Sequence, residues 1–231
     1  MEDVSPKLLE RVQKTFNEIC TKDKQLEKLK EAARDYEGLD LYAERLGDNL
    51  ARAFRVIGVE DLPNGRMYYN IADKVVRPLL EDNWNTVAQA GIEVQKGINA
   101  AAGLGLKPIV PKPESDRIYS LTFKISEYEN FADAQWLLGE PATNIIMRAA
   151  DAMAEGNALF QHNAGVETRF TRNVRYKCCE WCAERAGTWT YFDMPDDFWG
   201  RHEHCRCTID YKPEKGKGYR MNTSRNAFIR R

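Results

Sequence analysis

The sequence predicts a mainly α-helical protein, with a multi-helix body followed by a small α+β zinc-binding module and a flexible basic tail. Two changes along its 231 residues predict this organisation. Up to residue 165, apolar residues recur at the spacing of one helix face. Beyond it, polar and apolar residues alternate, and five of the six cysteines fall between residues 177 and 207. We therefore expect a helical body over 1–165, a Cys/His cap over 166–211 and a tail over 212–231.

The first half of the chain is expected to form long helices. Ser5 is predicted to cap the first one, with Pro6 in its first turn. Its apolar stripe is formed by Leu9, Val12, Phe16 and Ile19. A second helix is expected over about 39–57, where the loop DLPNGR interrupts the pattern. The apolar period resumes over 67–101, and Pro78 within it predicts either a kink or the meeting of two helices.

The second half begins with the segment GLGLKPIVPKPES, whose glycines and prolines predict a bend near 102–115. Shorter helices are expected over 116–127 and 132–138. Pro141 is predicted to begin a longer helix, which Gly165 ends as a left-handed cap. The alternating segments VETRFTRNVRY and TWTYF then predict two strands. The cysteines thus belong to a β-rich cap that follows a helical body.

Composition limits the setting in which the protein works. Apolar residues make up 43%, charged residues 30%, and the net charge is −1, which suits a soluble folded protein without a global field for nucleic acid or membranes. The N-terminus lacks a signal-peptide core, and no run approaches the ~18 apolar residues of a membrane helix. We expect folding in a reducing cytoplasm, where disulfides do not persist. Only the tail is basic, with seven Lys and Arg against one acid, Glu214.

The cysteines and histidines have the spacing of a metal site. Cys179 and Cys182 form C-x2-C, and His202, Cys205 and Cys207 form H-x2-C-x-C after an interval of 22 residues between Cys182 and Cys205. Two short pairs of this kind can complete a tetrahedron around zinc. We expect one structural zinc held by the four cysteines, with His202 as the substitute for Cys205 or Cys207. The weaker candidates are Cys178 and His204.

Three other interpretations of the cluster remain open at this stage. The cysteines could be reduced and buried as small apolar residues, paired in disulfides, or used as a nucleophilic Cys/His pair. A four-ligand zinc site has no open position for water, so it would stabilise the cap without catalysing a reaction. Hydrolysis would need a missing ligand and a nearby base such as Glu180 or Glu203.

The C-terminal motifs resemble those of phage head-morphogenesis proteins of the Mu F-like minor capsid family. The resemblance covers residues 157–211 and rests on NALFQHNAG, CCEWCAERAGTWTY and GRHEHCRCTIDY. The matching positions are Cys179, Cys182, Gly187, Tyr191, His202, Cys205 and Cys207. Many family members have a proline beside the histidine, whereas Gly200 and Arg201 precede His202 here.

The resemblance implies a structural virion protein that is not an enzyme. Such a protein is present in few copies and associates with the portal or the major capsid protein inside the head. It would be found in the host cytoplasm during assembly and then in the virion, and its basic tail could contact packaged DNA. Neither a membrane nor a small-molecule substrate is implied.

The alternative function is that of a zinc-dependent nucleic-acid-binding protein or nuclease. Its basis is a basic, strand-like segment beside three tryptophans, since cations and aromatic rings together can grip single strands. These residues are Arg169, Arg172, Arg175, Lys177, Trp181, Trp189 and Trp199. The competing interpretation is that the tryptophans fill the core of the cap while the basic residues stay solvated.

Overall fold

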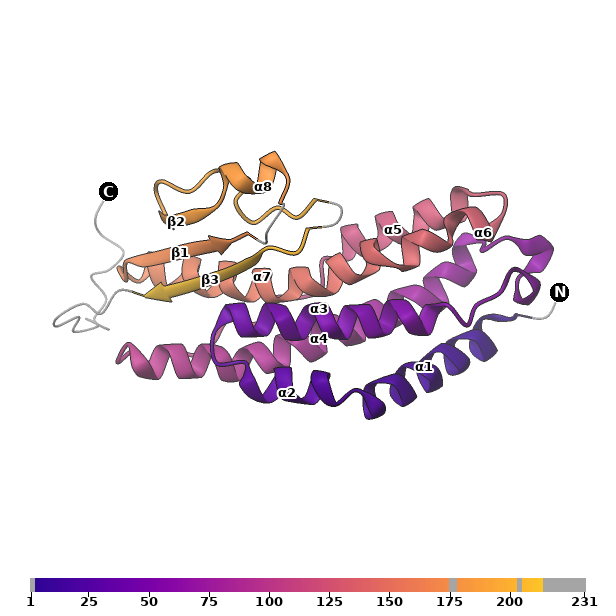
Figure 1. Cartoon of the computed structure of the whole chain (residues 1–231), viewed down its shortest axis with the longest axis horizontal. Helices are drawn as coiled ribbons and strands as arrows, with labels where there is room; N and C mark the ends of the chain where they lie inside the picture. The colour runs from indigo at the N-terminus through magenta and orange to yellow at the C-terminus, as the bar shows by residue number, and fades with distance from the viewer. Residues whose placement is uncertain (1–2, 175–177, 203–204, 214–231) are drawn as a thin grey trace.

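The fold is mainly helical, with a small antiparallel sheet near the C-terminus, as the sequence predicts (Figure 1). The computed structural model describes residues 3–174, 178–202 and 205–213. Among them, no helix combines the length and apolar character needed to cross a membrane. The helices of the first half are α1 (Ser5–Lys22), α2 (Lys24–Ala32), α3 (Tyr36–Phe54) and α4 (Tyr69–Ala101).

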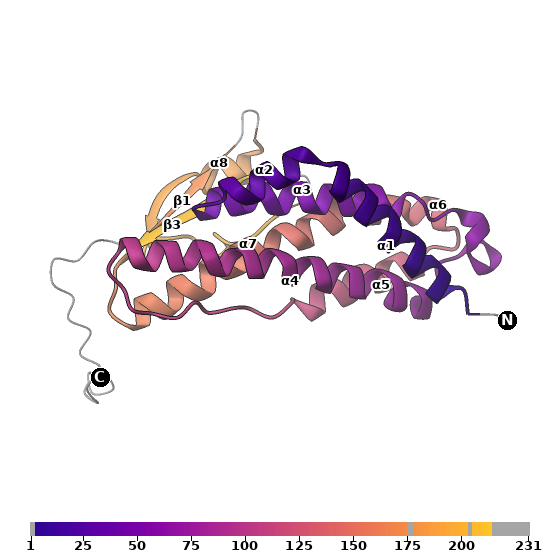
Figure 2. The ribbon, with the colours of Figure 1, turned by 90° about the horizontal axis from the view of Figure 1, so that it is seen from below.

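The helices of the second half of the chain pack alongside those of the first half. The extended segment 102–114 leads from α4 to α5 (Ser115–Glu127), which packs against α4 (Figure 2). Asn157 fixes this segment, because its side chain accepts the N–H of Ile109 at 2.7 Å and donates to the carbonyl of Ile109 at 2.8 Å. The remaining helical elements are α6 (Phe131–Ala134), the 3-10 helix η3 (Gln135–Leu138) and α7 (Glu140–Asn163).

The sheet has three strands in the order β2-β1-β3. Its strands are β1 (Thr168–Asn173), β2 (Gly187–Thr190) and β3 (Thr208–Pro213), and both pairings are antiparallel. In the central strand, Phe170 lies opposite Trp189 on one side and Tyr211 on the other. The sheet lies along α7 and α3, and the short helix α8 (Glu180–Glu184) connects β1 to β2 (Figure 1).

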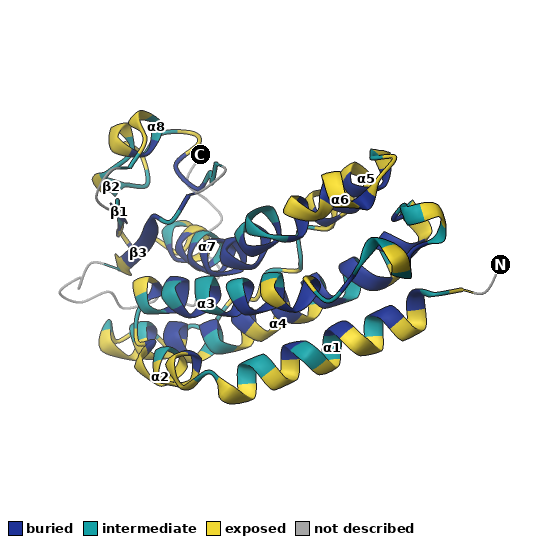
Figure 3. Ribbon diagram, turned by 45° about the vertical axis from the view of Figure 1, so that its right-hand side comes forward, coloured by how far each residue is buried: buried dark blue, intermediate teal, exposed yellow. Residues whose placement is uncertain are grey.

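One apolar core joins the helices to the sheet. The helices α3 and α7 pack against each other at its centre, and both are mostly buried in Figure 3, whereas the outer face of α1 is exposed. The same cluster includes Phe170, Trp199, Ile209 and Tyr211 from the cap. A second, separate cluster consists of Cys182, Cys205 and Cys207, with partly buried neighbours that include Trp181.

Several sequence expectations need correction in detail. Ser5 does not cap α1, because it lies in the first turn and its Oγ has no hydrogen-bond partner among the described residues. Instead, Asp3 accepts the N–H of Ser5 at 3.1 Å. Pro78 does not divide the run 67–101, since α4 continues through it as one helix. Gly165 has φ +83°, which confirms the left-handed cap.

The elements α2, α8 and β3 were not expected from the sequence, and the predicted loop DLPNGR contributes to the short 3-10 helices η1 (Val59–Asp61) and η2 (Pro63–Gly65). The strand β2 ends at Thr190, so only the first part of TWTYF is a strand. The predicted tail begins inside β3, which extends to Pro213, and residues 214–231 lie outside the described part of the chain.

Candidate metal centre

The two cysteine motifs meet beside the N-terminus of α8. Cys179 is the N-cap residue of this helix, and its Sγ accepts the backbone N–H of Cys182 at 3.4 Å. The tight turn therefore directs both sulfur atoms of C-x2-C to one side. His202, Cys205 and Cys207 approach from the segment that leads into β3.

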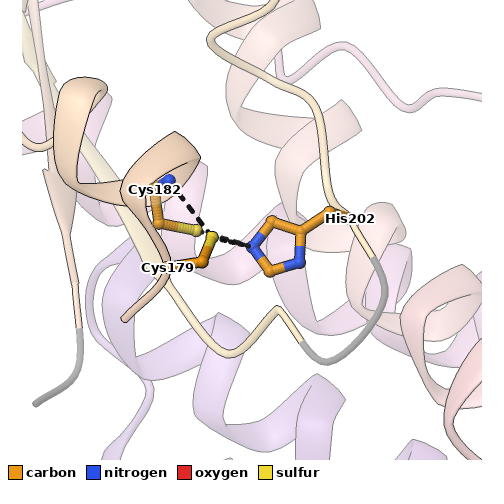
Figure 4. A group of neighbouring side chains, drawn as sticks. All are labelled: Cys179, Cys182 and His202. Carbon is orange, nitrogen blue, oxygen red and sulfur yellow. Dashed lines mark hydrogen bonds between the residues drawn. The ribbon is translucent and has the colours of Figure 1, made fainter. Parts of the chain in front are cut away.

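The sulfur and nitrogen atoms of the two motifs lie close enough together to bind one metal ion. The Nε2 atom of His202 is 3.0 Å from the Sγ of Cys179 and 2.9 Å from the Sγ of Cys182 (Figure 4). The Sγ atoms of Cys182 and Cys205 are 3.9 Å apart. Two thiolates on one zinc are separated by ~3.7 Å, given Zn–S bonds of ~2.3 Å in a tetrahedron, so this pair suits a shared ion.

All five predicted ligands belong to one continuous cluster that could hold a metal ion. Within it, the ligand atoms form two groups of three, each with all its atoms inside 4.8 Å. One group is Cys179, Cys182 and His202, and the other is Cys182, Cys205 and Cys207. Cys182 is common to both and is almost completely buried.

The remaining ligand candidates differ in position. Cys178 is partly buried and belongs to neither group, and the prediction for His204 falls outside the described residues. The six cysteines are free thiols, so the structure contains none of the disulfides that the sequence left open.

The environment of the cysteines separates their acidities. A hydrogen bond with Cys207 lowers the pKa of Cys205 to about 4, and the positive charges of Arg201 and Arg172 act in the same direction. Burial raises the pKa of the Cys182 thiol to about 11, and the hydrogen bond with Cys205 raises that of Cys207. These contacts favour the thiolate at Cys205 over the thiolates at Cys182 and Cys207, and the thiolate is the form that binds a metal ion.

A buried arginine next to His202 anchors the cluster to the helical body. Arg201 donates to both carboxylate oxygens of Asp151 on α7, at 2.5 and 2.7 Å, and to Asp40 on α3 at 2.6 Å. It also donates to the carbonyl oxygen of Cys207 at 2.9 Å. The side chains of all three charged residues are at most 2% exposed. Arg201 therefore ties the ligand-bearing segment to two helices.

The sequence did not identify this anchor. Arg201 is adjacent to a predicted ligand, but Asp40 and Asp151 are distant in the sequence and lie on helices whose polar residues are expected to face solvent. Asp40 has a second role, since it accepts the backbone N–H of Ile209 in β3 at 2.9 Å. Asp40 thus supports both the sheet and the segment that carries the candidate ligands.

The basic and aromatic residues of the cap are largely engaged in packing. Arg172 is 1% exposed and donates to the carbonyl oxygens of Phe198 and Gly200. Trp199 is buried in the main core, and the ring of Trp181 lies 4.0 Å from the guanidinium carbon of Arg185. Arg169 is exposed, Trp189 is partly buried, and Arg175 and Lys177 lie outside the described residues.

A pocket of about 450 Å³ between α5, η3 and α7 reaches His202. Its walls include apolar side chains such as Trp136 and Ile145, and three arginines contribute to it. Arg117 pairs with Glu114 at 2.6 Å, Arg148 pairs with Glu114 at 2.9 Å and Glu155 at 2.6 Å, and Arg201 pairs with its two aspartates. Because these guanidinium groups are already bound by carboxylates, they are poor sites for a phosphate.

Comparisons of this chain with family models, with curated proteins and with solved structures find no match.

Proposed function

We propose that the protein is a structural component of a phage head, of the Mu F-like minor capsid type. It associates with the portal or the major capsid protein during assembly in the host cytoplasm and remains in the virion. The biological setting comes from the resemblance of residues 157–211 to that family. The role of the cap is to provide a rigid, metal-stabilised element on the helical body.

The observation that carries the structural role is the buried Arg201. A cation held by two buried carboxylates fixes the segment next to His202 against α3 and α7. A catalytic zinc site instead keeps an open position that faces a substrate cleft. Fixing the ligands to the body in this way favours a structural site.

We assign the site to one zinc ion per chain. Thiolate and imidazole ligands in a tetrahedral set are typical of structural zinc. A single ion is favoured because Cys182 belongs to both groups of ligands, so two separate ions would compete for its sulfur atom. Zinc would be held by Cys182 together with three of Cys179, His202, Cys205 and Cys207.

Elemental analysis of protein purified without chelator tests the metal, with one zinc per chain as the expected result. In phage particles, Cys205→Ser is expected to remove the protein from heads or make them defective. Cys20→Ser is the matched control, because Cys20 lies in α1 outside both ligand groups. Zinc-free protein that still folds and enters heads would contradict the assignment, as would heads that tolerate Cys205→Ser.

The alternative function, zinc-dependent binding or cleavage of nucleic acid, requires exposed cations or a reactive zinc. We expect no nuclease activity and no effect of Glu180→Gln on particle infectivity, since a closed zinc site cannot activate water. DNA binding measured across a salt titration separates the functions. Tight binding with a steep salt dependence, or zinc-dependent cleavage, would favour the alternative.

A further inference from the structure

The sulfur atoms of the candidate metal centre differ in their access to solvent. Among the described cysteines, Cys179 alone is exposed. The three cysteines of the other ligand group, Cys182, Cys205 and Cys207, are at most 3% exposed. Cys178 is partly buried, packs against these three side chains and belongs to neither group. Since a reagent in solution reaches an exposed thiol first, Cys179 is the sulfur atom of the cluster that an oxidant meets.

Cys182 is the cysteine that shares a ligand group with Cys179. The ligand atoms of this group all lie within 4.8 Å of one another, and Figure 4 shows both sulfur atoms directed toward the ring of His202. The Sγ of Cys179 also accepts the backbone N–H of Cys182 at 3.4 Å, because the two residues belong to the first turn of α8. Cys205 and Cys207 share no group with Cys179. An oxidised Cys179 therefore has Cys182 as its partner for a disulfide.

We propose that Cys179 is an oxidation site, at which hydrogen peroxide converts Cys179 and Cys182 into a disulfide and the cluster loses its metal ion. This inference rests on the proposed function, because it concerns the regulation of the same zinc site. A phage head is assembled in a reducing cytoplasm, whereas a released virion meets an oxidising medium. The cap would thus be zinc-bound during assembly and would lose zinc only after exposure to an oxidant.

The reaction involves two sulfur atoms and one molecule of hydrogen peroxide. The Cys179 thiolate attacks one oxygen atom, the O–O bond breaks, and hydroxide leaves as the sulfenic acid forms. The Cys182 thiolate then attacks the Cys179 sulfur atom, the S–S bond forms, the S–O bond breaks, and a second hydroxide leaves. The two sulfur atoms together lose two electrons, which reduce the peroxide to two hydroxide ions. A thiol reductant reverses the change through a mixed disulfide.

The disulfide removes the candidate ligand on which both groups depend. Cys182 belongs to each group of three, so its loss leaves neither group complete. The new bond closes a loop within the first turn of α8 and makes no link to the rest of the molecule. Cys205 and Cys207 stay on the segment that Arg201 ties to the helical body, because this anchor does not involve their sulfur atoms. Oxidation is therefore expected to separate α8 from the segment that leads into β3.

Oxidation of the zinc-loaded protein by hydrogen peroxide tests the proposal. A chromophoric chelator measures the zinc that is released, and free thiols are then alkylated before digestion with trypsin. Trypsin places Cys178, Cys179 and Cys182 together on the peptide 178–185, and Cys205 and Cys207 on two further peptides. We expect zinc to be released while the peptide 178–185 loses two hydrogen atoms and keeps one alkylated thiol. The two further peptides should be alkylated and unlinked.

Two serine variants separate the exposed thiol from its neighbour in the sequence. Cys179→Ser keeps His202 and the group of three buried cysteines, so it should still bind zinc. Because the sulfur atoms of that group are almost completely buried, this variant should release zinc at least about ten-fold more slowly under the same peroxide. Cys178→Ser is the matched control, since Cys178 belongs to neither group. It should release zinc at the unaltered rate and form the same disulfide.

The outcomes distinguish this inference from the zinc assignment. Reduced protein that contains no zinc would contradict the assignment before any oxidant is added, and the release of zinc with it. In zinc-loaded protein, the oxidation site alone would be overturned by equal rates of release from Cys179→Ser and the unaltered protein, or by no release from either. It would also be overturned by a disulfide that links the peptide 178–185 to another peptide, or by loss of the disulfide in Cys178→Ser. The peptide masses of the unaltered protein test the pairing independently of any variant.

Discussion

At the scale of single residues, Cys182 and Arg201 determine how the C-terminal segment is held. Cys182 is the candidate ligand that belongs to both groups of three. Arg201 forms ion pairs with Asp40 on α3 and Asp151 on α7. The sequence placed the first in a ligand motif, but it contained no signal for the partners of the second. Each residue leads to a prediction with its own control.

Cys182→Ser is expected to weaken zinc binding more than Cys179→Ser or Cys207→Ser. Removing Cys182 breaks both groups of three, whereas either of the other changes leaves one group intact. Competition with a chromophoric chelator measures the zinc affinity of each variant, and Cys20→Ser should match the unaltered protein. Equal losses for the three ligand variants would show that the two groups do not share a central sulfur atom.

Arg201→Met is expected to lower the free energy of unfolding by ~3–5 kcal/mol, because it leaves Asp40 and Asp151 buried without their cation. The control is Lys96→Met, whose exposed pair with Glu93 is worth about 0–1 kcal/mol. Urea unfolding of both variants at equal zinc content measures the difference. A loss below ~1 kcal/mol for Arg201→Met would mean that the aspartates are protonated or hydrated without it.

At the scale of elements, the sequence predicted α1, α3 and α4 well because each buries residues that recur at helical spacing, whereas α7 is buried on all sides over residues 145–154. The helix α1 buries Leu8, Val12 and Phe16 and leaves the rest of its surface exposed or partly exposed, apart from Ser5 at its start. In contrast, α2 buries only Leu26, so its charged sequence has almost no period to detect. The strand β3 was missed because Thr208, Ile209, Asp210 and Tyr211 are all buried, which removes the alternation.

The sequence predicted which side chains come together at the candidate site, but not which residues hold them in place. The C-x2-C and H-x2-C-x-C spacings specify local turns, which the sequence determines directly. The partners of Arg201 depend on how α3 and α7 pack against the sheet, and long-range packing leaves no local pattern. Arg172 shows the same limit, since its basic strand position predicted solvent exposure and the structure buries it.

The junction of α1 and α2 depends on Asp23. Its carboxylate accepts the N–H groups of Gln25 and Leu26 at the start of α2, and it binds Arg45 on α3 at 2.6 Å. Hydrogen bonds from Arg45 hold the pKa of Asp23 well below its ordinary value. Since the pKa is lowered by folding, this stabilisation is complete above about pH 4 and is lost as the pH falls further.

Asp23→Ala is therefore expected to cost ~1–2 kcal/mol of unfolding free energy at pH 7, the range of a lost helix cap. The cost should shrink as the pH is lowered below 4, because the unaltered protein loses the same interaction by protonation. Asp116→Ala is the control, an exposed acid in the first turn of α5 that makes no side-chain cap. Urea unfolding at several pH values gives the comparison, and a cost that did not depend on pH would contradict the role of the charge.

At the scale of the whole molecule, the cap contains two differently held parts. The sheet shares the main core with the helices through Phe170, Ile209 and Tyr211, so its strands are stabilised by ordinary apolar burial. Among the described residues, the small cluster at the candidate metal centre buries three cysteines and is separate from that core. A bound metal ion is therefore expected to stabilise α8 and its surroundings, whereas apolar packing against the helices stabilises the sheet.

Removal of the metal with a chelator is expected to open residues 178–202 locally and leave the fold otherwise intact. Structural zinc contributes much of the stability of the segment that binds it, and segments with few buried apolar contacts open independently of the rest. Amide hydrogen exchange should become at least about ten-fold faster in α8 and remain unchanged in α3, α7, β1 and β3.

Arg201 limits the opening, because its bonds to Asp40 and Asp151 do not involve the metal and keep the end of this segment on the helices. In the Arg201→Met variant the same chelator should therefore extend the faster exchange into β3. Uniform loss of protection across the helices would show that the metal stabilises the whole molecule, and no change in α8 would show that apolar packing suffices there.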